Sequence, residues 1–172
     1  MGLSVEQPGD WWEVEALFDL CFAPGRTALS SYRLRDGVEP VAELCLLLRG
    51  AEGGEGRPLA GAIRYWPVRV GAAPALLLGP VAVHPTRQGE GLAGLLIRES
   101  LARAAALGAE RVLLVGDAPY YGRFGFLRLD GVIMPPPTNP ARVLGVALVP
   151  DAWAGVTGDV RPSPQSGARQ DL

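Results

Sequence analysis

The sequence has 172 residues, 48% of them hydrophobic, which fits one domain with a single sizeable core. Lys is absent, and the 16 Arg residues are balanced by 18 acidic residues, so the charge gives no reason to expect a nucleic-acid partner. No apolar run is long enough to span a membrane, and acidic residues interrupt the N-terminal segment where a signal peptide would lie. We therefore expect a soluble cytoplasmic protein with one domain over residues 1–160 and a disordered tail over 161–172.

Hydrophobic periodicity and turn residues predict a chain that mixes helices and strands. Asp10 and Glu13 form a capping-box pattern ahead of the first helix, and Gly108 is the expected C-cap of a later one. Pro80 cannot donate to a ladder, so its strand should bulge or leave a neighbour at Gly79-Pro80. The expected elements are helices over 11–22, 27–35 and 92–107, and strands over 41–49, 59–70, 75–83, 111–115, near 126, over 143–149 and over 156–160.

The two cysteines, Cys21 and Cys45, lie in apolar surroundings without Cys-x-x-Cys spacing or a neighbouring histidine cluster. This pattern argues against a metal site and favours free buried thiols. We therefore predict that the protein binds no metal.

A glycine-rich turn joins the strand over 75–83 to the helix over 92–107. Gly89 and Gly91 carry no side chains to keep a diphosphate from the backbone amides at the helix N-terminus, and the small Ala93 keeps the first turn open. The positive end of the helix dipole favours an anion at this position. The turn therefore favours a phosphate-bearing cofactor, and a tight turn without a ligand is the alternative.

Gly89-x-Gly91-x-x-Gly94 also matches the dinucleotide-binding fingerprint, and Asp117 follows at about the spacing, ~20 residues, of its ribose-binding acid. The context argues against that interpretation, because a five-residue loop separates the strand from the glycines and too little chain follows for more parallel units. A Walker phosphate loop is excluded because the sequence has no Lys.

Three blocks, in this order and spacing, resemble the GNAT superfamily of N-acetyltransferases: residues 78–85, 88–93 and 120–126. The family pattern Q/R-x-x-G-x-G/A is met by Gln88, Gly91 and Ala93. Residues 114–117 are similar to a bacterial branch of predicted acetyltransferases. The resemblance covers about residues 10–149 and implies the α/β GNAT fold. That fold has a mixed, mostly antiparallel sheet flanked by helices, whose central strands, here 75–83 and 111–115, splay apart.

The resemblance implies transfer of an acetyl group from acetyl-CoA to an amine acceptor by direct attack in a ternary complex. Val81, Ala82 and Val83 would bind the pantetheine arm through their backbone, in the gap between the splayed strands. Arg87 would contact phosphates of coenzyme A, although a solvated loop arginine is the alternative. The residues whose amides would hold the pyrophosphate are Gln88, Gly89, Gly91, Leu92 and Ala93.

Acyl transfer from a thioester requires a neutral amine, a stabilised oxyanion and a proton for the departing thiolate. The resemblance gives the last role to Tyr121, five residues before Phe126, whereas a buried packing tyrosine is the alternative. The general base stays open among Glu43, Asp117, His84 and a water chain, with a structural role favoured for His84.

The acceptor is not fixed by the sequence, and both small-molecule and peptide amines stay open. Trp11, Trp12, Tyr32 and Trp66 would line an acceptor pocket or form core. A free strand edge would also suit a homodimer. Two other functions on the same fold stay open, a non-catalytic acyl-CoA-binding regulator and an interaction module.

Overall fold

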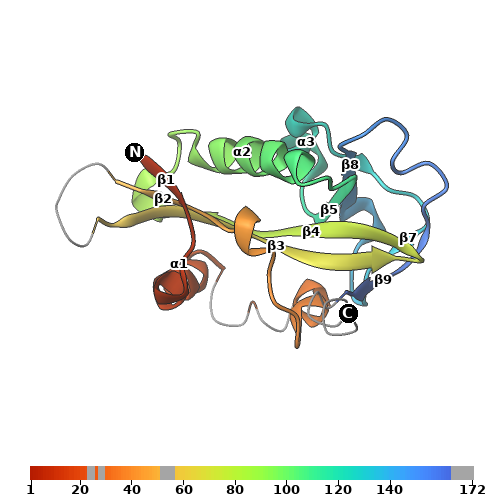
Figure 1. The fold of residues 1–172 in the computed structure, drawn as a ribbon, viewed down its shortest axis with the longest axis horizontal. Coiled ribbons are helices and arrows are strands. Elements are labelled where there is room, and N and C mark those ends of the chain that lie inside the picture. Colours follow the sequence, from red (N-terminus) through yellow and green to blue (C-terminus); the bar gives the residue numbers. More distant parts are fainter. Residues whose placement is uncertain (23–25, 27–29, 51–56, 164–172) are drawn as a thin grey trace.

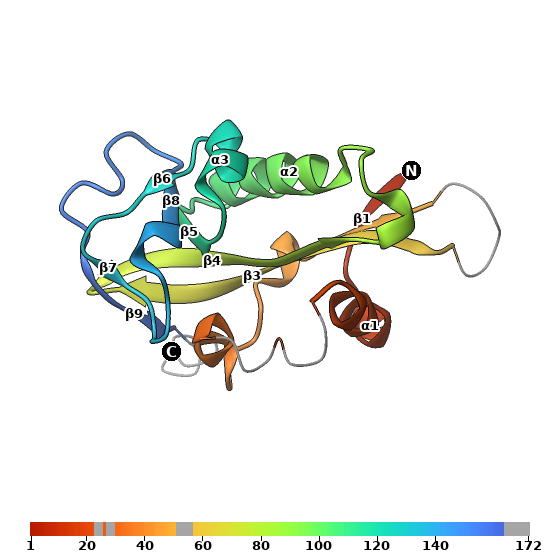
Figure 2. The same ribbon diagram turned by 180° about the vertical axis from the view of Figure 1, so that it is seen from behind.

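The computed structural model describes residues 1–22, 26, 30–50 and 57–163, which form a twisted sheet with helices on both faces (Figures 1 and 2). Over these residues the sheet has the order β1-β2-β3-β4-β5-β8-β6, and β9 pairs with both β3 and β7. The strands are β1 (Gly2–Val5), β2 (Leu46–Arg49), β3 (Leu59–Val70), β4 (Ala73–Val83), β5 (Arg111–Val115), β6 (Leu127–Arg128), β7 (Val132–Ile133), β8 (Val143–Ala147) and β9 (Gly158–Pro162). The helices are α1 (Trp11–Phe22), α2 (Leu92–Ala106) and α3 (Ala118–Tyr121).

The two faces of the sheet carry different helices (Figure 1). α2 and α3 cover one face, while α1 and the short 3-10 helix Ser30–Arg35 cover the other. Under α2, the hydroxyls of Tyr65 and Ser100 share a buried hydrogen bond of 2.7 Å. Under α1, Phe18 is fully buried and packs in a cluster with Ala82 of β4. β4 is therefore covered on both sides by helices.

The central strands separate where the sequence predicts. Ile63 pairs with Val81 but Tyr65 pairs with Leu78, so Gly79 and Pro80 together oppose a single residue of β3 and form a bulge at a cis Gly79-Pro80 bond. β4 pairs with β5 in parallel only through Leu76 and Leu77. Beyond Leu77 the two strands diverge, which confirms both the bulge and the splayed centre of the fold.

Helix α1 has the predicted bounds, but its predicted capping box is wrong. Asp10 instead accepts a hydrogen bond from the backbone N–H of Gln7, 2.8 Å away, and so belongs to the turn before the helix. Asp10 and Glu13 both pair with Arg49 of β2, at 3.0 and 2.6 Å. The two carboxylates therefore tie α1 to the sheet.

Other boundaries differ from the sequence predictions. Residues 41–49 are not one strand, because a 3-10 turn over Ala42–Leu44 precedes β2. The predicted helix over 27–35 is a 3-10 helix over Ser30–Arg35, with 27–29 outside the described residues. Arg161 and Pro162, which we assigned to the tail, extend β9 along β3, and residues 164–172 lie outside the described residues.

Two absences hold for the part of the chain that the structure describes. None of its helices combines the length and apolarity needed to cross a membrane. None of its clusters brings together three or more His, Cys, Asp or Glu side chains that could hold a metal ion. Cys21 and Cys45 are free, and the Cys45 thiol is buried and donates to the Val41 carbonyl over 3.3 Å.

Candidate active site

Two hollows follow one another along β4. The first, here called the β4–β5 pocket, has a volume of about 190 Å³ and is lined by residues 77–81 of β4, Leu114 and Val115 of β5, Tyr121, and a group on the other face that includes Tyr32 and Arg35. The second, here called the glycine-turn hollow, has a volume of about 440 Å³ and lies between Val83, the N-terminal part of α2, and α3 with the segment that follows it. Of the ten predicted site residues, seven line this hollow: Val83, Arg87, Gln88, Gly89, Gly91, Leu92 and Ala93.

The glycine turn has the geometry of an anion cradle. Gly89 and Gly91 both have positive φ angles, 86° and 76°, which favour glycine. A Cβ built at either position would meet no atom within 4 Å, so a side chain there would enter open space. Gly91 is the N-cap of α2 and supplies no side chain to the amides of the first turn. Those amides therefore remain available to an anion from solvent.

The positive charge of the glycine-turn hollow comes from arginines that sequence reasoning did not select. Arg87 forms a two-point ion pair with Glu90, at 2.7 and 3.0 Å, so its charge is already matched. Arg98 and Arg123 also line the hollow, and neither forms an ion pair within the described residues. The place of Arg98 beside the glycine turn could have been predicted from the sequence, because it follows Gly91 and Gly94 at helical spacing on one face of α2.

The three predicted residues of β4 divide between two faces of the strand. Val81 lines the β4–β5 pocket and Val83 the glycine-turn hollow. Ala82 lines neither, because its side chain points to the opposite face and packs against α1 with 5% of its surface exposed. Only the backbone of Ala82 is therefore in a position to take part in binding.

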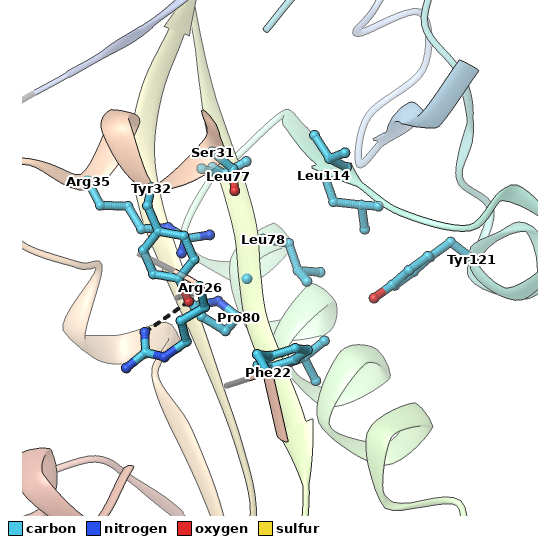
Figure 3. Close-up of a pocket in the computed structure, with 13 residues that line it drawn as sticks. Phe22, Arg26, Ser31, Tyr32, Arg35, Leu77, Leu78, Pro80, Leu114 and Tyr121 are labelled. Carbon is cyan, nitrogen blue, oxygen red and sulfur yellow. Dashed lines mark hydrogen bonds between the residues drawn. The ribbon is translucent and has the colours of Figure 1, made fainter. Parts of the chain in front are cut away.

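Tyr121 reaches the β4–β5 pocket from the last turn of α3, and its hydroxyl points into the pocket (Figure 3). Asp117 caps this helix by accepting from the Tyr120 N–H over 3.3 Å. The ring packs edge-on against Phe126, at 5.8 Å between centroids. Gly116 lies beneath the ring, because a Cβ there would come within 2.6 Å of Cε2. Burial, and to a lesser degree Tyr120, raises the pKa of Tyr121 to about 12, so its hydroxyl is protonated at neutral pH.

This arrangement coincides with a sequence match to the acetyltransferase (GNAT) family over residues 11–126, more than half of the chain. The chain belongs to the GNAT acetyltransferase family. The family and the fold that the three sequence blocks predict are thereby confirmed.

Two solved GNAT structures each match 94% of the chain. The GNAT N-acetyltransferase YhbS from Escherichia coli, in complex with CoA, is 27% identical with a TM-score of 0.78, and the match covers 94% of this chain and 89% of that one. A GNAT acetyltransferase from Brucella melitensis in complex with acetyl-CoA is 30% identical with a TM-score of 0.68, covering 94% and 95%. An E. coli K12 protein, the uncharacterized N-acetyltransferase YjhQ, is 42% identical over 50 residues, which span 29% of this chain and 28% of that relative.

The residues considered as general bases lie outside the β4–β5 pocket of this GNAT chain. His84 caps the 3-10 turn Pro85–Arg87, where its Nδ1 accepts from the Thr86 N–H over 3.2 Å. Asp117 caps α3, and Glu43 is exposed on the turn Ala42–Leu44. Within the described residues, the pocket lining contains no carboxylate and no imidazole. Its titratable groups are tyrosines and arginines.

The four aromatic residues considered for the acceptor of this GNAT chain have different places. Tyr32 lines the β4–β5 pocket. Trp66 is buried, and its indole N–H donates to the Gly79 carbonyl over 2.7 Å, which supports the bulge of β4. Trp11 stacks on the Arg64 guanidinium at 3.7 Å, and Trp12 is 81% exposed. Of the four, Tyr32 lines the β4–β5 pocket, whereas Trp11 and Trp66 line a second hollow that also includes Arg35.

Proposed function

We propose that the chain transfers an acetyl group from acetyl-CoA to an amine by direct attack in a ternary complex. The observation that carries the proposal is the placement of an open glycine cradle and a protonated tyrosine in two hollows along one strand. The family membership, and the CoA and acetyl-CoA bound in complexes of two solved relatives, support this assignment.

The glycine-turn hollow fits the diphosphate of coenzyme A. The open Cβ positions of Gly89 and Gly91 leave the first-turn amides of α2 free to donate to phosphate oxygens. Arg98 and Arg123 would supply the positive charge, since Arg87 is held by Glu90. Val81, Ala82 and Val83 would pair with the pantetheine arm through their backbone, beyond the point where β4 leaves β5.

Tyr121 is placed to supply a proton to the sulfur. In the proposed reaction the amine nitrogen bonds to the thioester carbonyl carbon, the carbon–sulfur bond breaks, and the thiolate takes the proton of the Tyr121 hydroxyl. The proton lost by the amine returns to solvent, from which Tyr121 regains its own. No dedicated base is required, because a positively charged pocket favours the neutral amine over the ammonium.

Calorimetry of acetyl-CoA with the purified protein tests the cofactor, with NAD and ATP as controls. Micromolar binding of acetyl-CoA alone, about −8 kcal/mol, is expected. An amine screen that detects released thiol then tests turnover. Binding without turnover of any amine would favour the acyl-CoA-binding regulator, and no binding would favour the interaction module.

Location and assembly extend the proposal. Two free cysteines fit a reducing compartment such as the cytoplasm. β1 pairs only with β2 among the described residues, so its outer edge is available to a second copy, and we propose a homodimer through this edge. Light scattering after size-exclusion chromatography tests the dimer, and a monomer mass at micromolar concentration would contradict it.

A further inference from the structure

The β4–β5 pocket contains a cation that the proposed transfer chemistry does not use. Nε and Nη1 of Arg35 are shielded from solvent and have no hydrogen-bond partner in the described part of the chain. The guanidinium lies 3.9 Å from the centre of the Tyr32 ring and 5.6 Å from that of Trp66. Ring faces attract a cation, but they replace neither water nor a carboxylate at its N–H groups. Two donors of Arg35 are therefore unsatisfied within the described residues, and a third nitrogen, Nη2, faces Gly79.

The neighbouring arginines form ion pairs, which distinguishes them from Arg35, although Nη2 of Arg64 is also buried without a hydrogen-bond partner in the described part of the chain. Arg26 pairs with Glu15 at 2.7 Å and Asp19 at 3.0 Å, and also donates to the Tyr32 hydroxyl. Arg64 pairs with Glu6 at 3.1 Å and Glu15 at 3.3 Å. Arg35 has no ion pair within the described residues, and burial lowers its pKa to about 10, which still leaves it charged at neutral pH. A cation in this position gains free energy from any anion that can reach it.

The charge is placed opposite the proposed reaction centre. Arg35 and Tyr32 line the pocket from the short helix Ser30–Arg35, whereas Tyr121 lines it from α3 on the other face of the sheet (Figure 3). A Cβ added at Gly79 would lie 3.5 Å from Nη2 of Arg35, so the guanidinium reaches the bulge of β4 at Gly79-Pro80, here called the break in β4. One small molecule lying across this break would meet Arg35 at one end and Tyr121 at the other.

We propose that the acceptor is a small amine that carries a carboxylate, as an amino acid does, and that Arg35 binds this carboxylate. The proposal rests on the proposed acetyl transfer and names its substrate class. Because the described residues that line the pocket include no carboxylate, an acidic acceptor meets attraction and a purely cationic polyamine meets repulsion. The volume of about 190 Å³ is below the ~300–1,000 Å³ of pockets for drug-sized ligands, which suits an amino acid better than a peptide.

Matched acceptors test the proposal. Thiol release is measured with an amino acid, its carboxamide, the corresponding decarboxylated amine and the corresponding aminophosphonate. We expect kcat/KM for the amino acid to exceed that for the decarboxylated amine at least tenfold, with the carboxamide at the lower value. In Arg35→Gln this ratio should fall to about one, while the KM for acetyl-CoA stays within about twofold. Arg35→Lys should recover part of the preference.

Arg33→Gln is the control, because Arg33 lies in the same short helix, is exposed and donates to the Pro136 carbonyl rather than lining the pocket. It should keep the preference of the wild type. Equal rates with all four acceptors in the wild type, or an intact preference in Arg35→Gln, would overturn the assignment. A preference for the aminophosphonate over the amino acid would also overturn the assignment, because it would show that Arg35 binds a phosphoryl group of the acceptor rather than a carboxylate.

The anion site is separable from the acetyl transfer. If acetyl-CoA binds and no amine is turned over, calorimetry of the amino acid in the presence of CoA still measures the site. Binding by the wild type that Arg35→Gln lowers at least tenfold would support the anion site although the proposed transfer had failed. Equal binding by the two proteins, or none by either, would refute the anion site.

Discussion

Replacing Gly91 by Val separates the conformational role of this glycine from its role in binding. The φ angle of 76° disfavours a side chain by roughly 1–2 kcal/mol, although a Cβ there meets no protein atom within 4 Å. For a domain of this size that cost lowers the Tm by a few degrees. The same side chain would project into the glycine-turn hollow, where the amides of α2 would hold a diphosphate.

The loss of affinity can be worked from the hydrogen bonds. If Val at position 91 keeps a phosphate from two first-turn amides, at about 1.5 kcal/mol for each bond to a charged group, the loss is about 3 kcal/mol, or roughly 100-fold in the Kd of coenzyme A. Calorimetry of coenzyme A with a variant whose circular dichroism matches that of the wild type measures this loss.

Gly108→Val is the matched control at the other end of α2. Gly108 has a φ angle of 89° and equally open space at its Cβ position, so the conformational cost is similar. It does not line the glycine-turn hollow. Both variants should lose a few degrees of Tm, and only Gly91→Val should lose coenzyme A. Unchanged affinity in a folded Gly91→Val protein would refute the location of the diphosphate.

Three further substitutions address the tyrosines. Tyr121→Phe should lower kcat by about 10²-fold with little change in acetyl-CoA affinity, and full turnover of this variant across pH 6–10 would rule out the proton-donor role. Burial raises the pKa of Tyr121 to about 12, so ionisation of its hydroxyl should not reduce wild-type turnover below about pH 10. Gly116→Ala should displace the Tyr121 ring, since the added Cβ would lie 2.6 Å from Cε2, so stopped-flow kinetics should show a lower kcat at unchanged acetyl-CoA affinity. Ser100→Ala should cost about 1–3 kcal/mol by urea denaturation, because it leaves the buried Tyr65 hydroxyl without its partner, and an unchanged midpoint would contradict this reasoning.

The sequence predicts correctly those elements that neighbouring residues determine. The bounds of β3 and β5 match the prediction, because each is an apolar run closed by turn residues. β1 was missed, since its four residues form a strand only by pairing with β2, as in the register of Leu3 with Leu48. The predicted strand over 41–49 was wrong in its first part for a similar reason. The Val41 N–H donates to the Tyr65 carbonyl over 2.8 Å, a tertiary contact that no local pattern contains.

The candidate site likewise has one part that local sequence determines and one that depends on tertiary contacts. The glycine turn was found because positive φ angles and open amides require glycine at fixed positions. The charged groups were not found, because their state depends on which carboxylates fold next to them. Arg87, which we expected to contact phosphates, is paired with Glu90, whereas Arg35 remains unpaired within the described residues. No sequence spacing distinguishes a matched arginine from an unmatched one.

The break in β4 has a consequence for how such an enzyme diversifies. Both hollows take lining residues from this one strand, residues 77–81 in the β4–β5 pocket and Val83 in the glycine-turn hollow. The charged wall of the β4–β5 pocket is built from Arg26 and the short helix Ser30–Arg35, which do not line the glycine-turn hollow. Under the proposed function, substitutions in this wall would therefore change the acceptor without altering the residues proposed to hold coenzyme A.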